Sequence, residues 1–595
     1  MRLRNVSIIV VLAILSAAAG SITGTPTSIR LAQRYSAKGA RLGKAGAPGD
    51  PAPSATSDDG DFSWADTAVA NLSDFGEPSI DVDHQNNMYV TAPGGAGVQM
   101  WKSTDLGQTF QYIEIGSDNG GGDSEIEFNL NDVGFTADLE VSDSAVSRST
   151  DGFKTWEQQD VGIEQDRQWF AHQCAKTIYL VYHDFAAELE LLSRSDDAGK
   201  TWDPNPVPVG NPGDAPGNQD EPLAADQGVN TFSGPIAVNQ KNGDVYVVYA
   251  ISSKEGNVTT GVPPFGEPQQ IVVGVSHDNG ATFVLHLIEG GDVGELAGVI
   301  FPWITIDVAG NVYVSYARRE AADKPLNIYM SYSKDRGDNW AKPYPVNTDV
   351  NAGAHIYSTI SAGDDGVVDV AWYTSSKPDP NDEASKWYVD FAQVKNAASQ
   401  TPQVSQSRVY QDPIHEGSIC LNGTLCILGG DRSLLDFFQV QVGPDGMANI
   451  AFANNASPDK IQRVWYARQT RGPSAGNGLL DERICGGGGG GGGGGELKGP
   501  HVHLRVSDAT PQKGEKITFF TRLGVCGDHR GTNVELKQEE KGQYNTIATK
   551  KLSRDCHAKF TIPAAFGQAS FRATWPKQDD DHRAGKSKPV SVTTH

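Results

Sequence analysis

The chain has 595 residues, with 49 Lys and Arg against 73 Asp and Glu, which gives a formal net charge of -24. Its 21% charged and 8% aromatic residues differ from the charge-rich, aromatic-poor composition of disordered proteins. The negative charge argues against a protein that wraps nucleic acid or lies on anionic lipid, because both need clustered Lys and Arg. The 67 Gly and 32 Pro favour a fold with many turns over a helical bundle.

The N-terminus has the pattern of an export signal. Arg2 and Arg4 precede a short apolar stretch and three consecutive alanines, which predicts a signal peptide at residues 1–19. An uncleaved signal anchor is the alternative. Residues 20–63 are rich in Gly, Pro, Ala and Ser, which predicts a flexible leader. No later stretch is long and apolar enough for a transmembrane helix, so we expect a secreted protein, extracellular or at the cell surface.

An octapeptide with the pattern Ser-x-Asp-x-Gly-x-Thr-Trp recurs five times, each time after a β-rich segment. We expect it to be the turn that closes a hairpin, in which Ser and Asp bind turn amides and Gly supplies a positive φ. Two copies depart from the pattern, with Phe153 in the Gly position and Asn339 in the Thr position, and we expect looser turns there. The copies lie at 103–110, 149–156, 195–202, 276–283 and 333–340.

A second repeat is seen seven times and is typical of strand, Asn/Asp/Gly turn and strand. Units of this kind, placed side by side over about 410 residues, predict an all-β fold built as a β-propeller. Seven blades are expected, with six as the alternative if a weak unit is miscounted. The copies occupy 77–92, 123–138, 167–182, 233–250, 301–317, 356–372 and 436–452.

The octapeptides resemble the Asp-box, or BNR, repeat of the sialidase superfamily, over residues 64–470 or so. The resemblance implies a propeller at residues 64–480 with its Asp-boxes on the outer rim, away from the axis where ligands bind. It therefore implies a structural role for the box aspartates, which are Asp105, Asp151, Asp197, Asp278 and Asp335.

The C-terminal part differs in composition from the predicted propeller. Ten consecutive glycines predict a flexible linker at residues 481–499. Residues 500–595 alternate between apolar and polar positions, which predicts a small β-sandwich, and they resemble an immunoglobulin-like accessory domain of bacterial exported proteins. From residue 496 onward, 17 Lys and Arg stand against 11 Asp and Glu. This domain could contact an anionic cell-envelope polymer or the propeller, or be a solvated sandwich without such a role.

Six cysteines in an exported chain permit disulfides. We expect the pairs Cys420–Cys426 and Cys526–Cys556. Cys174 and Cys485 are then left over, and the sequence does not decide whether they pair with each other. No Cys-x-x-Cys pair is present, so a thiolate zinc site is not expected.

No cofactor is predicted apart from a structural Ca²⁺. Residues 118–125 and 213–222 offer oxygen ligands with flexible glycine spacing, but neither segment has the EF-hand spacing. No metal ligand is therefore assigned.

The mouth of the central channel is where a ligand site is expected, because loops from all blades converge there. Alignment of the repeats places polar residues at or just before the innermost strands, although each taken alone could be a surface loop residue. The ligand-binding candidates are Glu77, Arg167, His355 and Arg432. The catalytic candidates are Asp123, Glu125, Asp166, Arg167, Arg318, Arg432 and Asp436.

A sialidase-like enzyme would need three arginines for the substrate carboxylate, a Tyr nucleophile activated by Glu, and an Asp acid/base. The family takes its first arginine from a Phe-Arg-Ile-Pro motif, but no arginine lies between Arg41 and Arg148 here. Arg167, Arg318 or Arg319, and Arg432 could form a different cluster, with Tyr373 or Tyr466 as nucleophile.

The sequence therefore favours a secreted propeller that recognises glycans or surface proteins. The alternative is a secreted sialidase-like exo-glycosidase with a divergent site, and hydrolysis of neutral sugars by paired carboxylates is a further form of it. The sequence indicates no nucleic-acid partner and no oligomeric state.

Overall fold

The computed structural model describes residues 55–476 and 502–594. The chain divides into two units, the first ending at residue 487 and the second beginning at residue 488. The gaps within the described ranges are 60–61, 70–75, 95–96, 116–120, 141–142, 163–164, 185–188, 211–229, 253–267, 291–295, 322–323, 350–351, 422–430, 457–462, 507–510, 524–532, 541–542, 554–556, 577–584 and 588–589. The predicted signal peptide and linker lie outside the described residues.

Seven antiparallel sheets of four or five strands make up the described part of the first unit. The first four in chain order are β3 (Ser79–Val82), β4 (Met88–Ala92), β5 (Gln99–Ser103) and β6 (Gln111–Glu114); β7 (Ser124–Phe128), β8 (Gly134–Leu139), β9 (Ser144–Ser149) and β10 (Glu157–Val161); β11 (Gln165–Gln173), β12 (Thr177–Asp184), β13 (Leu189–Ser195) and β14 (Val207–Pro208); and β15 (Asn230–Val238), β16 (Val245–Ser252), β17 (Pro268–Ser276) and β18 (Val284–Gly290).

The other three sheets have the same plan. They are β19 (Leu296–Ala297), β20 (Trp303–Ile306), β21 (Val312–Arg319), β22 (Asn327–Ser333) and β23 (Tyr344–Pro345); β24 (His355–Ala362), β25 (Val367–Ser375), β26 (Lys386–Lys395), β27 (Gln403–Arg408) and β28 (His415–Glu416); and β1 (Ala55–Asp59), β2 (Phe62–Ala68), β29 (Gln439–Val442), β30 (Ala448–Asn454) and β31 (Arg463–Arg471). Each copy of the second repeat supplies two paired antiparallel strands of one sheet, so the strand–turn–strand prediction is confirmed.

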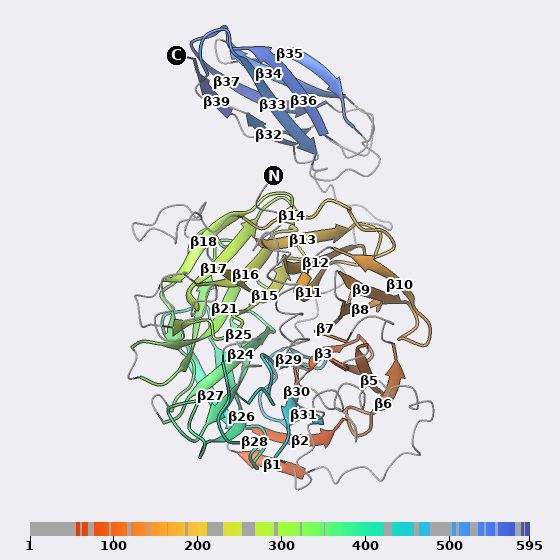
Figure 1. Ribbon diagram of the computed structural model, residues 1–595, viewed down its shortest axis with the longest axis vertical. Helices are drawn as coiled ribbons and strands as arrows, with labels where there is room; N and C mark the ends of the chain where they lie inside the picture. The colour runs from red at the N-terminus through yellow and green to blue at the C-terminus, as the bar shows by residue number, and fades with distance from the viewer. Residues whose placement is uncertain are drawn as a thin grey trace, which may run out of the picture. The chain divides into compact units, whose positions relative to one another are not determined.

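One strand from each of the seven sheets contributes to a closed ring, and we call these seven the innermost strands. The ring runs through β3, β7, β11, β15, β20, β24 and β29 and returns to β3. Figure 1 shows several of these strands toward the middle of the first unit, with later strands of each sheet farther out. Radial packing of sheets around an axis is the architecture of a β-propeller.

One sheet joins the two ends of the propeller. Its order is β1, β2, β31, β30, β29, so the N-terminal strand β2 pairs with β31, the last described strand of the first unit. Phe62 and Trp64 of β2 are fully buried, and the Trp64 indole donates to the Ser407 hydroxyl at 3.2 Å. The flexible leader expected at 20–63 is therefore wrong at its end, because β1 and the start of β2 belong to a sheet.

The octapeptides connect third to fourth strands and hold a repeated set of hydrogen bonds. In the first copy, the Ser103 hydroxyl accepts from the amide of Gly107 at 2.9 Å. Asp105 accepts from the amide of Thr109 at 2.9 Å and from its hydroxyl at 2.6 Å. The third and fourth copies repeat this set around Asp197 and Asp278. The turn prediction is confirmed.

The expectation of looser turns in the second and fifth copies is wrong. Phe153 adopts a φ of 60°, and its amide donates to the Ser149 hydroxyl at 2.8 Å, as the glycine does elsewhere. Around Asp151 the two bonds from Thr155 are also kept. In the fifth copy the side-chain amide of Asn339 replaces the threonine hydroxyl and donates to Asp335 at 2.6 Å.

The box also contacts the preceding sheet. A Cβ on Gly199, whose φ is 75°, would lie 2.3 Å from Cε1 of Phe135, so the close approach of this ring requires glycine. In the second copy, Phe153 itself packs edge-on against Tyr89, with ring centroids 6.2 Å apart. The octapeptide thus closes a hairpin and packs one sheet on the next.

The second unit contains two further antiparallel sheets. One consists of β32 (Val502–Val506), β33 (Lys516–Leu523) and β36 (His557–Pro563), and the other of β34 (Asn533–Glu540), β35 (Gln543–Lys551), β37 (Gln568–Trp575), β38 (Gly585–Lys586) and β39 (Val590–Thr593). Both sheets contribute to one hydrophobic core, with Phe519 and Phe560 from the first and Leu536, Phe571 and Trp575 from the second.

The structure bears only in part on two further predictions, the disulfide pairs and the absence of a transmembrane helix. Neither described cysteine, Cys174 or Cys420, is free, while Cys426, Cys485, Cys526 and Cys556 lie outside the described residues, so the pairings stay predictions. Within the described ranges, no helix has the length and apolar character needed to cross a bilayer.

Candidate functional site

The mouth is the end of the channel at which the innermost strands begin, and two of these strands bulge there. The pairing register shifts between Asp166 and Gln168 in β11 and between Ile356 and Thr359 in β24. A bulge adds a residue to one strand and re-aims side chains.

Four carboxyl groups and one arginine gather at this mouth, and we call them the mouth cluster: Glu77, Asp123, Asp166, Arg432 and Asp436. They come from four different sheets or from the segments that lead into them. Glu77 accepts a hydrogen bond from the backbone amide of Asp436 at 2.9 Å. Arg432 forms an ion pair with Asp436, and its guanidinium lies 3.9 Å from Glu77. Asp123 acts electrostatically on the other three carboxyl groups.

Burial and the charges of neighbouring acids favour the protonated forms of Glu77, Asp166 and Asp436. Burial, followed by the charge of Asp123, raises the pKa of Glu77 well above its usual range. The same two causes raise the pKa of Asp166 to about 7. Burial also raises the pKa of Asp436, against the opposing charge of Arg432. The cluster can therefore hold and donate protons near neutral pH.

Arg167 lies beside the cluster, but its guanidinium binds to neighbouring residues of the protein. Its guanidinium donates to Glu125 and to the carbonyl of Ser124, both at 2.9 Å. It stacks 3.5 Å from the ring centroid of Trp169 and 4.1 Å from that of Phe437. With an exposed fraction of 2%, this arginine is a buried structural cation. Glu125, predicted as catalytic, is its partner.

Arg318 lies in a different group of side chains. Its guanidinium is 3.3 Å from Glu289 and stacks on Tyr329, whose hydroxyl donates to Glu320 at 2.7 Å. The structure therefore does not bring the three predicted arginines together, and Arg432 is the one in the mouth cluster. A clamp of three arginines for a carboxylate is not formed by these residues.

The two predicted nucleophile candidates are packing residues. Tyr373 stacks on Phe438 with centroids 4.1 Å apart, and its hydroxyl accepts from the amide of Ala453. Tyr466 donates to Asn449 at 2.6 Å.

Tyr357 is the tyrosine beside the mouth cluster, and sequence reasoning missed it. It lies in the β24 bulge with a φ of 57°. Among the described residues its buried hydroxyl has no hydrogen-bond partner. Burial, followed by the charge of Asp436, raises its pKa well above the usual range, so the phenol is a neutral donor and no phenolate nucleophile. The bulge in β24 places Tyr357 at the mouth. The alternation of apolar and polar residues along a strand does not reveal a bulge, so the sequence contains no sign of this position.

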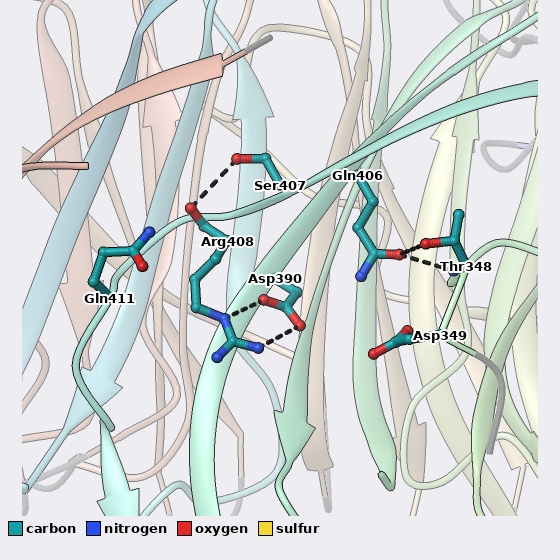
Figure 2. Close-up of a pocket in the computed structure, with 7 residues that line it drawn as sticks. All are labelled: Thr348, Asp349, Asp390, Gln406, Ser407, Arg408 and Gln411. Atoms are coloured by element: carbon teal, nitrogen blue, oxygen red, sulfur yellow. Dashed lines mark hydrogen bonds and ion pairs between the residues drawn. The ribbon is translucent and has the colours of Figure 1, made fainter. Parts of the chain in front are cut away.

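His355, predicted to bind ligand at the mouth, is fully buried instead. Its Nδ1 lies 3.2 Å from the hydroxyl of Thr374, and its Nε2 lies 3.6 Å from Asp349. Asp349 lines a polar pocket on the outer strands of the same sheet (Figure 2). The histidine thus faces this outer pocket and not the mouth cluster.

Below the mouth, the channel contains a cavity of about 220 Å³. Glu125 faces it, as do Asp81 and Glu127, and His172 contacts Glu127 through Nδ1 at 2.7 Å. Burial lowers the pKa of His172 to about 4, which keeps the ring neutral.

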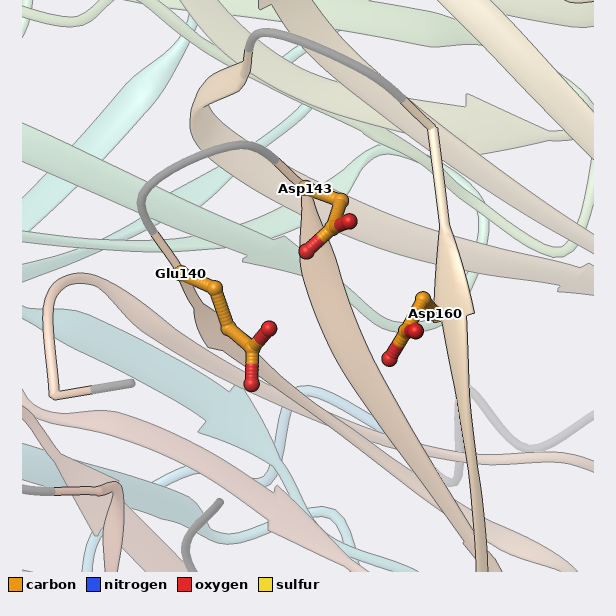
Figure 3. Close-up of side chains that lie close together, drawn as sticks. All are labelled: Glu140, Asp143 and Asp160. Atoms are coloured by element: carbon orange, nitrogen blue, oxygen red, sulfur yellow. The ribbon is translucent and has the colours of Figure 1, made fainter. Parts of the chain in front are cut away.

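The two segments predicted to bind calcium lie wholly or partly outside the described residues. Among the described residues, Glu140, Asp143 and Asp160 have carboxylate oxygens within 4.8 Å of one another. Figure 3 shows their side chains converging from the β8–β9 turn and β10. These acids are half-buried or exposed, and exposed acidic groups are common without an ion.

No family model matches the chain, and no curated protein matches it. Solved structures that match include a Hadza microbial sialidase, with 12% identity over 78% of this chain and 74% of that one and a TM-score of 0.32. A mutant NanB sialidase from Streptococcus pneumoniae matches with 10% identity, 67% and 68% coverage and a TM-score of 0.34. A GH43 beta-xylosidase/alpha-arabinofuranosidase from a compost metagenome matches with 10% identity, 62% and 99% coverage and a TM-score of 0.24. Similarities of this size carry no argument about the activity of this chain.

Proposed function

We propose that the protein is a secreted glycoside hydrolase that binds a neutral glycan at the mouth cluster and cleaves it with two carboxyl groups. The observation that carries this proposal is the convergence of four carboxyl groups from four sheets, one of which, Asp166, has a pKa of about 7. Glycoside hydrolysis needs one carboxyl group that is protonated at working pH and a second that acts on the anomeric carbon or on water.

Asp166 is the proton donor in this proposal, because burial and the charge of Asp123 keep its proton bound near neutral pH. Asp123, its electrostatic neighbour, is the second carboxyl group. Arg432 holds Asp436 in place, and Glu77 fixes the backbone of the same segment. The Tyr357 hydroxyl supplies a neutral donor at the base of the cluster.

A neutral sugar fits this site better than sialic acid does. The cluster contains one arginine, already paired with Asp436, against four acids, and Arg167 is stacked and bonded inside the protein. A sugar carboxylate would therefore meet an excess of acidic groups, and its desolvation would not be compensated.

The larger architecture is part of the proposal. Each of the seven sheets is taken as one blade, and the signal peptide would deliver the protein outside the cell. The second unit is taken as an immunoglobulin-like sandwich, and the excess of Lys and Arg in its sequence would favour contact with an anionic cell-envelope polymer.

Glycan recognition without turnover is the second candidate. It is favoured by the internal bonds of the cluster, because Glu77 and Arg432 are both already engaged with Asp436. Such pre-organised polar groups suit binding as well as catalysis.

A panel of p-nitrophenyl glycosides separates the two candidates. We expect the purified chain to hydrolyse at least one neutral glycoside and to leave the sialoside intact. Asp123→Asn should lower kcat for that glycoside by about 100-fold or more, because the second carboxyl group is needed for every leaving group. Asp160→Asn, an exposed control on β10, should leave kcat unchanged. Binding of a neutral glycan without turnover would support recognition alone, and turnover of the sialoside alone would contradict the neutral-sugar proposal.

A further inference from the structure

A second polar site lies away from the mouth cluster, on the outer strands of the β24–β28 sheet. It is a pocket of about 380 Å³, a size within the range of small-molecule sites. Figure 2 shows Arg408 facing Asp390 and Gln406 facing Thr348. The lining residues come from β26, from β27 and the segment after it, and from the segment after β23. They are Thr348, Asp349, Asp390, Gln406, Ser407, Arg408 and Gln411.

The pocket and the mouth cluster share one end of the propeller but no residue. The innermost strands begin at the mouth and neighbouring strands are antiparallel, so the fourth strand β27 ends there, at Arg408. Asp390 and Arg408 belong to the third and fourth strands, which places the pocket outward from the axis.

The charges in the pocket nearly cancel. Arg408 donates to both oxygens of Asp390, at 2.8 and 3.1 Å, and the Asp390 side chain is buried. Asp349 is then the remaining carboxylate of the lining. A divalent cation such as Ca²⁺ takes six or more oxygen ligands, so one remaining carboxylate is a poor site for it. An anion would be repelled.

The lining offers donors and acceptors rather than apolar surface. Gln406 accepts through Oε1 from the backbone amide and the hydroxyl of Thr348, at 2.8 and 2.9 Å. Those bonds fix the Gln406 amide plane and do not use its two N–H donors. Gln411 adds a second, exposed amide. Fixed amides and carboxylates suit the paired hydroxyl groups of a sugar ring, each of which donates and accepts.

A buried histidine lies against the pocket. His355 has an exposed fraction of 0%, and its Nε2 has no hydrogen-bond partner among the described residues. This atom is aimed at Asp349, from which it is 3.6 Å away. This contact places the Asp349 carboxylate at the wall of the pocket.

We propose that this pocket binds a neutral saccharide unit, separately from the mouth cluster. Asp349 and the Gln406 amide would bind neighbouring hydroxyl groups, and the Asp390–Arg408 pair would provide a fixed polar wall. Because the two sites share one end of the propeller, a glycan held here would be kept close to the mouth.

Ligand-observed NMR and calorimetric titration of the full chain test this proposal. The probes are lactose, cellobiose, xylobiose and chitobiose, with glucuronic acid and CaCl₂ alone as competing ligand classes. At least one disaccharide should bind, and Gln406→Ala and Asp349→Asn should each weaken it by about 10-fold, the effect expected for one lost hydrogen bond to a buried ligand group. Gln403→Ala, an exposed glutamine on the same strand, should leave the affinity unchanged.

Asp166→Asn should also leave this affinity unchanged, which separates the pocket from the proposed activity at the mouth. Binding that survives Gln406→Ala and Asp349→Asn with unchanged melting temperatures would overturn the proposal. So would the absence of binding by all four disaccharides, or preferential binding of glucuronic acid or Ca²⁺.

Discussion

Each buried carboxyl group with a shifted pKa makes the stability of the folded protein depend on pH, and Asp369 is an example. Asp369 on β25 has an exposed fraction of 0% and accepts one hydrogen bond, from Gln393 at 3.0 Å. Burial raises its pKa to about 7. Because the folded-state pKa lies above the unfolded value, its contribution to stability is complete below about pH 4 and is lost as the pH rises through 7.

Asp369→Asn should remove this loss. At pH 8 the unfolding free energy of the variant should exceed that of wild type by up to about 4 kcal/mol, because the folded-state pKa of Asp369 lies about three units above its unfolded value. At pH 4 the two proteins should differ little. Urea unfolding at both pH values measures the difference. An equal change at both pH values would contradict the protonation account of Asp369.

Residue positions at the mouth could be predicted in part. The repeats mark where each innermost strand begins, and this predicted that the residues of the mouth cluster lie at one end of the channel. They are Glu77, Asp123, Asp166, Arg432 and Asp436. Whether such a group faces a ligand or the protein depends on packing that no repeat encodes.

The misplaced and missed residues show this limit. Arg167 is enclosed by Trp169 and Phe437, and His355 faces an outer pocket. Tyr357 went unnoticed because a bulge shifts the register of its strand.

At the scale of elements, the hydrogen bonds of the octapeptide are kept more strictly than its residue identities. Both copies that depart from the pattern keep the full set, because Phe153 adopts the required positive φ and Asn339 supplies a donor of the right reach. The sequence revealed the turns, since Ser, Asp and Gly recur at fixed spacing. It did not reveal that these turns also pack against the preceding sheet, since that contact is made by residues far away in sequence.

The fifth copy gives a matched pair of variants. Asn339→Ala loses the 2.6 Å bond to Asp335 and should lower the unfolding free energy by about 1 kcal/mol. Asn339→Thr restores the hydroxyl of the other copies and should stay within about 0.5 kcal/mol of wild type. Thermal and denaturant unfolding measure both. Equal destabilisation by the two variants would show that the side-chain bond is not what holds this turn.

At the scale of the whole molecule, the net charge of -24 and the turn-rich composition indicated a large β protein, and the repeats located its sheets. The closure of the last sheet by an N-terminal strand was not predicted. It depends on β2 pairing with β31 across almost the whole unit, and the low-complexity composition before it suggested a leader without structure.

Trp64 on β2 tests how much this closure contributes. Its ring is fully buried and packs edge-on to Phe391, with centroids 4.9 Å apart. Trp64→Ala should cost about 3–5 kcal/mol, the range for a large-to-small change in a core. Trp156→Ala, at a tryptophan that is 38% exposed, should cost less than about 1 kcal/mol. Comparable losses in the two variants would contradict a special role for the closing strand.

The central claim is that Asp166 donates a proton to the leaving group of a neutral glycoside, and leaving-group dependence tests it most directly. The measurement is kcat/KM of wild type and Asp166→Asn for two glycosides of the same sugar, one with a p-nitrophenyl group and one with a second sugar as leaving group. Loss of the donor should lower hydrolysis of the disaccharide by about 100-fold or more, and that of the activated aryl glycoside far less. Equal losses on both substrates, or no loss on either, would contradict the account.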